Sequence, residues 1–141
     1  MGFVRDKEHW LFKYSPREWI RAAMGELKRA EQAYAKRSTR GGLAGARRAA
    51  GMALNAALIA EPNAAWGRTY IEHLSALGNA ADVPDAVRKA ATHLMQAAPM
   101  GGGNVVVLHT KNEDTRVLEA ARDVIAHAYA VMVRHEADTP S

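Results

Sequence analysis

Small and apolar residues recur at spacings of three and four along most of the chain, and this period restricts the fold more than any other feature. The longest segment with the pattern is 113–136. At ~100° per residue, one side of it carries an apolar stripe made of Leu118, Ala121, Ile125, Ala128 and Met132. We therefore expect an all-α fold, an up-and-down bundle of about five helices.

Prolines, glycines and capping residues predict where the helices begin and end. Residues 15–18 read Ser-Pro-Arg-Glu, the composition of a capping box with proline at the first helical position, and predict the start of the first helix. The second helix is expected over 43–60, with an alanine-rich face that permits close packing, and Pro62 stops it. Asn63 is expected to cap the third helix. The last two are expected to begin at 83–85 and at 113.

A single domain is expected over 15–136, preceded by an N-terminal arm at 1–14 and followed by a disordered tail at 137–141. A chain of 141 residues is long enough to build one hydrophobic core. Before the last helix, the triple glycine at 101–103 is interpreted as a flexible turn. The apolar run at 105–108 that follows is either a strand-like strap or a buried loop.

The composition excludes several kinds of site. There is no cysteine, so disulfides, thiolate zinc sites and thiol nucleophiles are excluded. The six histidines are scattered, without a His-x-x-x-His pair, and we expect no metal and no other cofactor. No apolar run approaches the ~18 residues that span a membrane, and we expect a cytoplasmic protein without membrane contact.

Positive charge is concentrated in the first two predicted helices. Residues 17–48 contain nine lysines and arginines against three glutamates, whereas the whole chain has a formal net charge of +4. A basic patch of this kind attracts polyanions. Arg40, Arg47 and Arg48 are therefore candidates for contacts with nucleic acid or phosphate. The alternative, that these side chains form salt bridges or solvate the outer helix faces, stays open.

Four polar residues suited to phosphate chemistry lie in the middle of the last predicted helix: Arg122, Asp123, His127 and Tyr129. Arg122 and Tyr129 are seven residues apart and lie on one flank of the apolar stripe. Asp123 and His127 are four apart and are expected to touch on a side that points away from the core. This set suits phosphoryl transfer without metal, because imidazole exchanges protons near pH 7 and guanidinium binds phosphate oxygens. Asp123 can fix the tautomer of His127, and Tyr129 can donate a hydrogen bond.

Two valines are expected beside His127 on this outer side. Val124 and Val131 both flank the histidine in the helical projection. Valines are unusual on a helix face that contacts only water. They indicate a contact surface for a partner helix.

The same four residues resemble the Arg-polar-x3-His-x-Tyr motif of HEPN domains. These domains are compact helical bundles, many of them ribonucleases of toxin–antitoxin and defence systems. The resemblance implies that Arg122 and His127 are the catalytic pair of a metal-independent endoribonuclease, supported by Asp123. It also implies that the site forms between two protomers of a homodimer acting on RNA. A further implied partner is an antitoxin of the nucleotidyltransferase type, which modifies the matching tyrosine, here Tyr129, in some members.

The spacing from arginine to histidine is less specific than the complete motif. Arg68 and His73 share it, as do Arg88 and His93. Neither pair has an acidic residue after the arginine, a tyrosine two positions after the histidine, or a place in the last helix. Many HEPN domains lack catalysis, so the alternative is a non-catalytic helical module that binds a nucleotide, RNA or a protein. DNA binding has less support, because no helix-turn-helix is recognisable.

Overall fold

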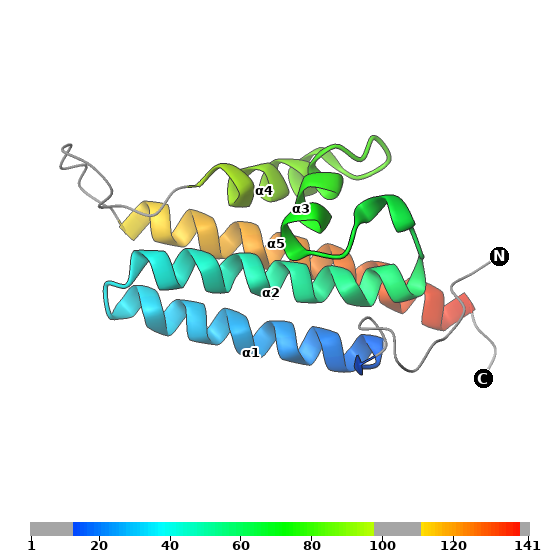
Figure 1. The fold of residues 1–141 in the computed structure, drawn as a ribbon, viewed down its shortest axis with the longest axis horizontal. Helices are drawn as coiled ribbons and strands as arrows, with labels where there is room; N and C mark the ends of the chain where they lie inside the picture. Colours follow the sequence, from blue (N-terminus) through cyan, green and yellow to red (C-terminus); the bar gives the residue numbers. More distant parts are fainter. Residues whose placement is uncertain (1–12, 98–110, 139–141) are drawn as a thin grey trace.

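The structure, a computed structural model, describes residues 13–97 and 111–138 and is all-helical over these ranges (Figure 1). The predicted all-α bundle is confirmed. Its elements are α1 (Pro16–Ala35), α2 (Thr39–Ala60), the short 3₁₀ helix η2 (Ala64–Trp66), α3 (Tyr70–Gly78), α4 (Asp85–Gln96) and α5 (Lys111–Asp138). The predictions for 1–12, 101–103, 105–108 and 139–141 lie outside the described residues. The fifth helix continues past its predicted end at 136 to Asp138.

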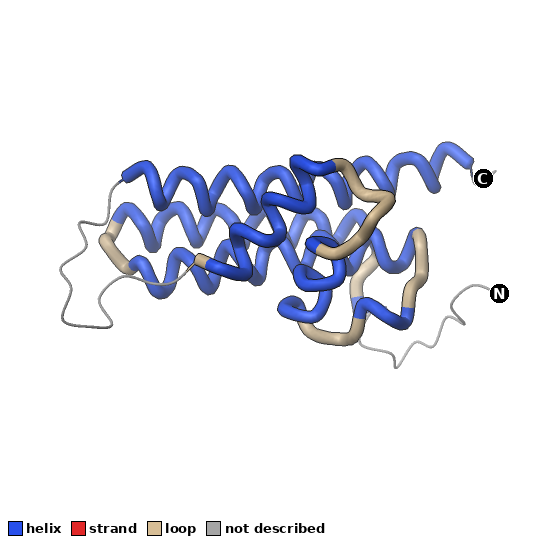
Figure 2. The backbone as a smooth tube through the Cα atoms, turned by 90° about the horizontal axis from the view of Figure 1, so that it is seen from above, coloured by secondary structure: helices blue, strands red, loops and turns tan. Residues whose placement is uncertain are grey.

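The three long helices α1, α2 and α5 lie side by side along the molecule (Figures 1 and 2). α1 runs antiparallel to α2, and α5 runs in the same direction as α2. The shorter α3 and α4 cover one side of these helices, with α4 packed on α5 and α3 packed on α4 and α2. α2 and α5 therefore have neighbours on several sides, and each must present a wide apolar surface.

The start of α1 is fixed by the capping box that the sequence predicts. Ser15 Oγ accepts a hydrogen bond from the backbone N–H of Glu18 at 3.2 Å. In return, the Glu18 carboxylate accepts one from the backbone N–H of Ser15 at 3.0 Å. This backbone hydrogen bond is the main reason why the pKa of Glu18 is lowered. Pro16 takes the first helical position, where the missing N–H is not needed.

The turn between α1 and α2 is tighter than expected. Arg37 has a φ of 63°, in the left-handed region. The N–H of Ser38 donates to the carbonyl of Ala33 at 2.8 Å, which is the closing bond of a Schellman-type helix end. α2 consequently begins at Thr39, four residues before its predicted start.

Small residues form the face on which α2 meets its neighbours, as predicted. A Cβ added at Gly42 would lie 2.6 Å from the ring of Tyr34. A Cβ added at Gly45 would lie 3.1 Å from the Cβ of Ala30. Glycine disfavours a helix by about 1 kcal/mol, and here the close approach of α1 explains its use. Other buried small residues of α2 are Ala46, Ala49, Ala50, Gly51, Ala53, Ala56 and Ala57.

The prediction that Asn63 caps the third helix is wrong. Asn63 Oδ1 accepts from the N–H of Ala65 at 3.1 Å, but the element that it caps is only the three-residue η2. Gly67 then turns the chain with a φ of 76°. Thr69 caps α3 by accepting from the N–H of Glu72 at 3.1 Å. The Thr-x-x-Glu sequence at 69–72 is a capping-box composition and is the signal that marks this start.

The apolar stripe of α5 is wider than predicted. Leu118, expected in the core, is only partly buried. Val124 and Val131 are 0% and 6% exposed inside the protomer, so the prediction that they face a partner helix is wrong. The reason is that α5 packs against both α2 and α4, which extends its buried arc beyond a single contact line. The buried residues along it are Val117, Ala120, Ala121, Val124, Ile125, Ala128, Val131 and Met132.

A buried polar pair ties α3 to α2. His73 is fully buried, and its Nδ1 and Nε2 lie 2.9 Å from the Trp66 carbonyl oxygen and 2.9 Å from Asn55 Oδ1. Burial is the main cause that lowers the pKa of His73, so the ring is neutral at pH 7 and carries one N–H. With Nδ1–H donating to Trp66, Nε2 must accept. Nε2 accepts a hydrogen bond from Asn55 Nδ2 when the side-chain amide is flipped by 180°, which exchanges the positions of its N and O atoms.

The free energy of unfolding is expected to fall as the pH drops below about 6.5, the ordinary pKa of histidine. Because the pKa of His73 is lowered in the folded state, the unfolded chain binds the proton more tightly. Protonation therefore stabilises the unfolded state relative to the folded state. The contribution is complete above pH ~6.5 and is lost as the pH falls toward the folded-state pKa. Urea unfolding at pH 7 and pH 5 measures this change. Glutamine does not titrate, so in the His73→Gln variant the free energy of unfolding should change less between pH 7 and pH 5. An equal change in the variant would assign the effect to other groups.

Candidate functional site

The four motif residues lie along the face of α5 that the bundle leaves uncovered. None of them belongs to the hydrophobic core. His127 is half-buried at one edge of this face. The residues exposed along its middle are Glu119, Arg122, Asp123, Ala126, Tyr129 and Ala130. We call this surface the open face of α5.

Arg122 lies on the edge of the open face that is next to α1. Its Nη2 is 2.6 Å from Glu31 Oε1, with the two side chains 49% and 43% exposed. Exposed ion pairs of this kind contribute about 1 kcal/mol or less, so a phosphate group can replace Glu31. Tyr129 is on the same edge, where it is 45% exposed and interacts with Arg17 of α1.

His127 lies on the other edge, roughly 140° around the helix axis from Arg122. Burial is the main cause that lowers the pKa of His127, and the positive charge of Arg134 lowers it further. The carboxylates of Glu61 and Asp82 act in the opposite direction. The imidazole is therefore neutral at pH 7 and able to accept a proton.

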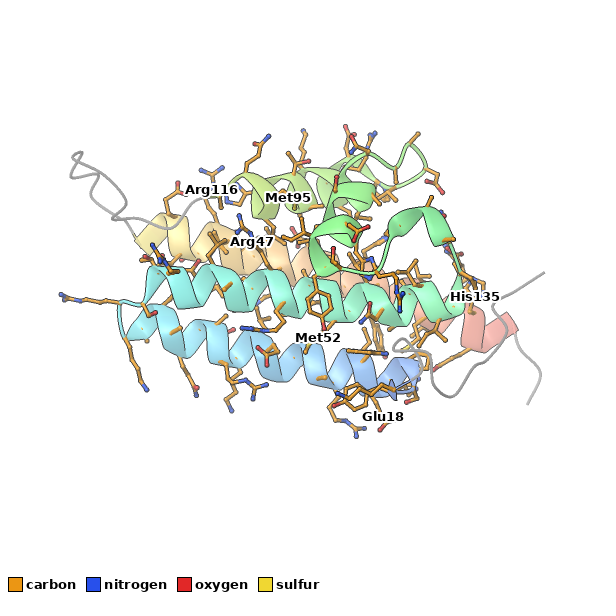
Figure 3. The ribbon with its side chains drawn as sticks, viewed as in Figure 1. Glu18, Arg47, Met52, Met95, Arg116 and His135 are labelled. Atoms are coloured by element: carbon orange, nitrogen blue, oxygen red, sulfur yellow. The ribbon has the colours of Figure 1, made fainter. Side chains whose placement is uncertain are left out.

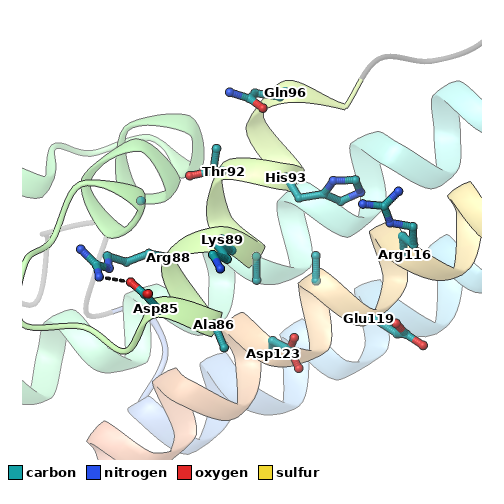
Figure 4. Close-up of a pocket in the computed structure, with 13 residues that line it drawn as sticks. Asp85, Ala86, Arg88, Lys89, Thr92, His93, Gln96, Arg116, Glu119 and Asp123 are labelled. Carbon is teal, nitrogen blue, oxygen red and sulfur yellow. Dashed lines mark hydrogen bonds and ion pairs between the residues drawn. The ribbon is translucent and has the colours of Figure 1, made fainter.

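Asp123 forms no hydrogen bond with His127 among the described residues, although the two are four apart. It lies on a groove of about 590 Å³ between α4 and α5 (Figure 4). Three basic residues line this groove, Arg88, Lys89 and Arg116, together with three acidic ones, Asp85, Glu119 and Asp123. With equal numbers of both charges, the groove has no net attraction for a polyanion.

The basic residues expected to bind phosphate have separate environments. Arg47 is partly buried and reaches toward α4, where Nε donates to the Leu94 carbonyl at 2.7 Å and Nη2 donates to those of Met95 at 3.2 Å and Ala97 at 2.6 Å (Figure 3). It thus satisfies the carbonyl groups at the end of α4. Arg48 pairs with Glu26 at 3.1 Å. Arg40 is exposed in the first turn of α2 and has no ion pair with a described residue.

Replacing Arg47 with methionine is expected to lower the free energy of unfolding by about 2 kcal/mol, the scale of hydrogen bonds to a buried charged group. The change removes three hydrogen bonds to the end of α4 and keeps most of the aliphatic volume. Arg48→Met is the matched control, since it removes only an exposed pair with Glu26. Denaturant unfolding of both variants measures the difference. Equal losses would contradict a structural role for Arg47.

The side chain of His127 opens onto a cavity of about 800 Å³ between α2, η2, the loop after α3, and α5. Trp66 and Arg134 also line it, and neither was predicted from the sequence. Arg134 is seven residues after His127 and therefore on the same face of α5, which is the signal that could have identified it. Its Nη2 lies 2.8 Å from Glu61 Oε1, and the same oxygen lies 2.9 Å from the Nε2 of His135. The hydrogen bond from His135 is the main cause that lowers the pKa of Glu61.

In the part of the chain that the structure describes, no three histidine, aspartate or glutamate side chains gather in a way that could hold a metal ion. No helix among the described residues combines the length and apolar character needed to cross a membrane.

No protein-family model, no curated protein and no solved structure matches the chain. The similarity to HEPN domains remains a prediction from the motif at 122–129.

Proposed function

We propose that the chain is a metal-independent endoribonuclease of the HEPN type that acts as a homodimer, with its active site across the open faces of two α5 helices. One observation carries the proposal. The chemically competent residues Arg122, His127 and Tyr129 all border a single uncovered helix face and take no part in the core. Side chains without a packing role on an uncovered face are available for contact with a substrate.

A second protomer supplies what one protomer lacks. Within one chain Arg122 and His127 lie on opposite edges of the open face, so a single phosphate does not meet both at close range. The centre of the face, at Ala126 and Ala130, is small and exposed, which permits close approach of a second α5. In the proposed dimer, a two-fold axis across this face places two imidazoles and two guanidinium groups in the same interface.

The proposed chemistry uses the 2′-OH of RNA as the nucleophile. A neutral His127 takes the proton of this hydroxyl, whose oxygen attacks the adjacent phosphorus. In dimers in which the second protomer's His127 carries a proton, that imidazolium returns it to the departing 5′-oxygen. Arg122 binds the phosphate oxygens as negative charge develops on them. The products are a 2′,3′-cyclic phosphate and a 5′-hydroxyl, so atoms and protons balance without a metal.

The test is RNA cleavage by the purified protein in the presence of EDTA. We expect the chain to elute as a dimer and to cut single-stranded RNA, leaving 2′,3′-cyclic phosphate ends. Cleavage that requires a divalent cation, or products with 5′-phosphate ends, would contradict the mechanism. RNA binding by folded protein without cleavage would favour the second candidate.

That second candidate is a non-catalytic helical module that binds a nucleotide, RNA or a protein. The observation that favours it is that His127, Trp66 and Arg134 line one cavity. Such a module would hold a ligand without consuming it.

An antitoxin of the nucleotidyltransferase type remains a proposed partner of the ribonuclease, and its target Tyr129 is accessible at 45% exposure.

A further inference from the structure

The cavity beside His127 has the size and walls of a small-molecule site. Its volume of about 800 Å³ lies within the range of ~300–1,000 Å³ that is typical of ligand pockets. The apolar part of its wall includes Leu54, Ala57, Leu58, Val83 and Val131. These residues come from α2, α5 and the loop before α4, so the cavity is built from the bundle itself.

The charged groups around this cavity are predominantly negative. Glu61 and Asp82 are carboxylates, and the His127 imidazole is neutral at pH 7. Among the described residues, Arg134 is the single arginine or lysine that lines the cavity. Arg134 is already neutralised by Glu61 at 2.8 Å. An anionic ligand therefore finds no cation that it can bind without displacing a carboxylate.

Asp82 is the group with unused binding capacity. It is exposed at the cavity rim, and it forms no hydrogen bond or ion pair with any described residue. Asp82 and His127 line the same cavity. A carboxylate in this position can accept charge-assisted hydrogen bonds from a ligand.

Trp66 provides a second recognition element for a cation. The indole is partly buried and lines the same cavity. The face of an indole ring carries partial negative charge, and it attracts ammonium groups more strongly than other aromatic rings do. An aromatic ring, an apolar wall and an unpaired carboxylate together favour a positively charged ligand with an apolar body.

We propose that this cavity binds a small organic cation, an amine whose apolar body packs on Trp66 and the aliphatic wall and whose ammonium group donates to Asp82. This site is additional to the proposed ribonuclease chemistry and does not depend on it. The ligand's apolar part supplies burial, and the carboxylate selects for charge.

The test uses sets of three compounds that have the same body and differ in charge, such as 2-phenylethylammonium, 2-phenylethanol and phenylacetate. Calorimetry and thermal shift assays at pH 7 measure binding to the full chain. The cation is expected to bind about tenfold more tightly than its matched alcohol and to exceed phenylacetate by more, given the strength of charge-assisted hydrogen bonds. Asp82→Asn should lower the affinity for the cation by about tenfold and leave that for the alcohol unchanged.

Asp85→Asn is the matched control, because Asp85 lies on α4 and does not line this cavity. It should leave the affinity for the cation unchanged. Three results would overturn the proposal: phenylacetate or its analogues binding as tightly as the matched cations or more tightly, an unchanged affinity for the cation in Asp82→Asn, or no binding of any cation at millimolar concentration. RNA cleavage is not measured in these assays, so the outcome is independent of the ribonuclease proposal.

Discussion

Replacing His127 with alanine is expected to lower the rate of RNA cleavage by about a thousandfold, since general acid–base catalysis contributes roughly 10²–10⁴. In the proposed dimer the change removes both the base and the acid. Replacing Arg122 with alanine is expected to lower it by about 10²–10³, the usual cost of losing a group that stabilises transition-state charge. Both variants should fold, because Arg122 is exposed and His127 lies outside the core.

Two substitutions on the same helix serve as controls for these losses. Arg116→Ala removes an exposed arginine whose pair with Glu113 is long, at 3.5 Å. His135→Ala removes a histidine that hydrogen-bonds Glu61 at 2.9 Å, close to the end of the helix. Both should retain cleavage within a few-fold of the unchanged protein. Cleavage that survives both Arg122→Ala and His127→Ala would contradict the assignment of these residues.

The second large effect concerns stability. Gly51→Ala is expected to lower the free energy of unfolding by about 2–3 kcal/mol, as overpacking a tight core does. An added Cβ would overlap the Cβ and ring of Tyr70, which begins α3 and cannot withdraw without moving the helix. For a protein with a typical stability of ~5–15 kcal/mol this is a large fraction.

Gly25→Ala is the matched control for this prediction. Gly25 also lies in a helix interior, but the nearest atom to an added Cβ is Arg29 Nη2 at 3.9 Å. The same change there should stabilise the protein by up to ~1 kcal/mol, because alanine favours helix over glycine. Denaturant unfolding compares the two. A Gly51→Ala variant as stable as Gly25→Ala would show that α2 and α3 are not held as closely as described.

Features with a local cause could be predicted from the sequence. The capping box at 15–18 and the helix stop before Pro62 depend on residues within one turn of each other. The small-residue face of α2 was also predictable, because alanines and glycines at helical spacing allow another helix to approach closely. The fold class follows from these local signals together.

Features that depend on which helices become neighbours were missed. Val124 and Val131 were placed outside because the projection of α5 assumed one contact line, whereas α5 packs on both α2 and α4. Arg47 was grouped with other basic residues, and only the position of α4 shows its carbonyl partners.

The residues of the candidate site could be named from the sequence, but their contacts with one another and with other helices could not. The motif at 122–129 does lie on an uncovered face, but the expected hydrogen bond between Asp123 and His127 is not formed among the described residues. Glu31 of α1 is the observed partner of Arg122. The cavity that His127 and Trp66 line is formed by segments far apart in the sequence, and helical periodicity does not report such contacts.

Mixed dimers test most directly whether two protomers form one active site. An unchanged protomer and a His127→Ala protomer, carrying different affinity tags and co-expressed, are purified through both tags in turn. If one imidazole acts as the base and its twin as the acid, the mixed dimer should cut RNA at least about a hundredfold more slowly than the unchanged dimer. A mixed dimer that keeps half of the activity would mean that each protomer works alone, and the composite site would be excluded.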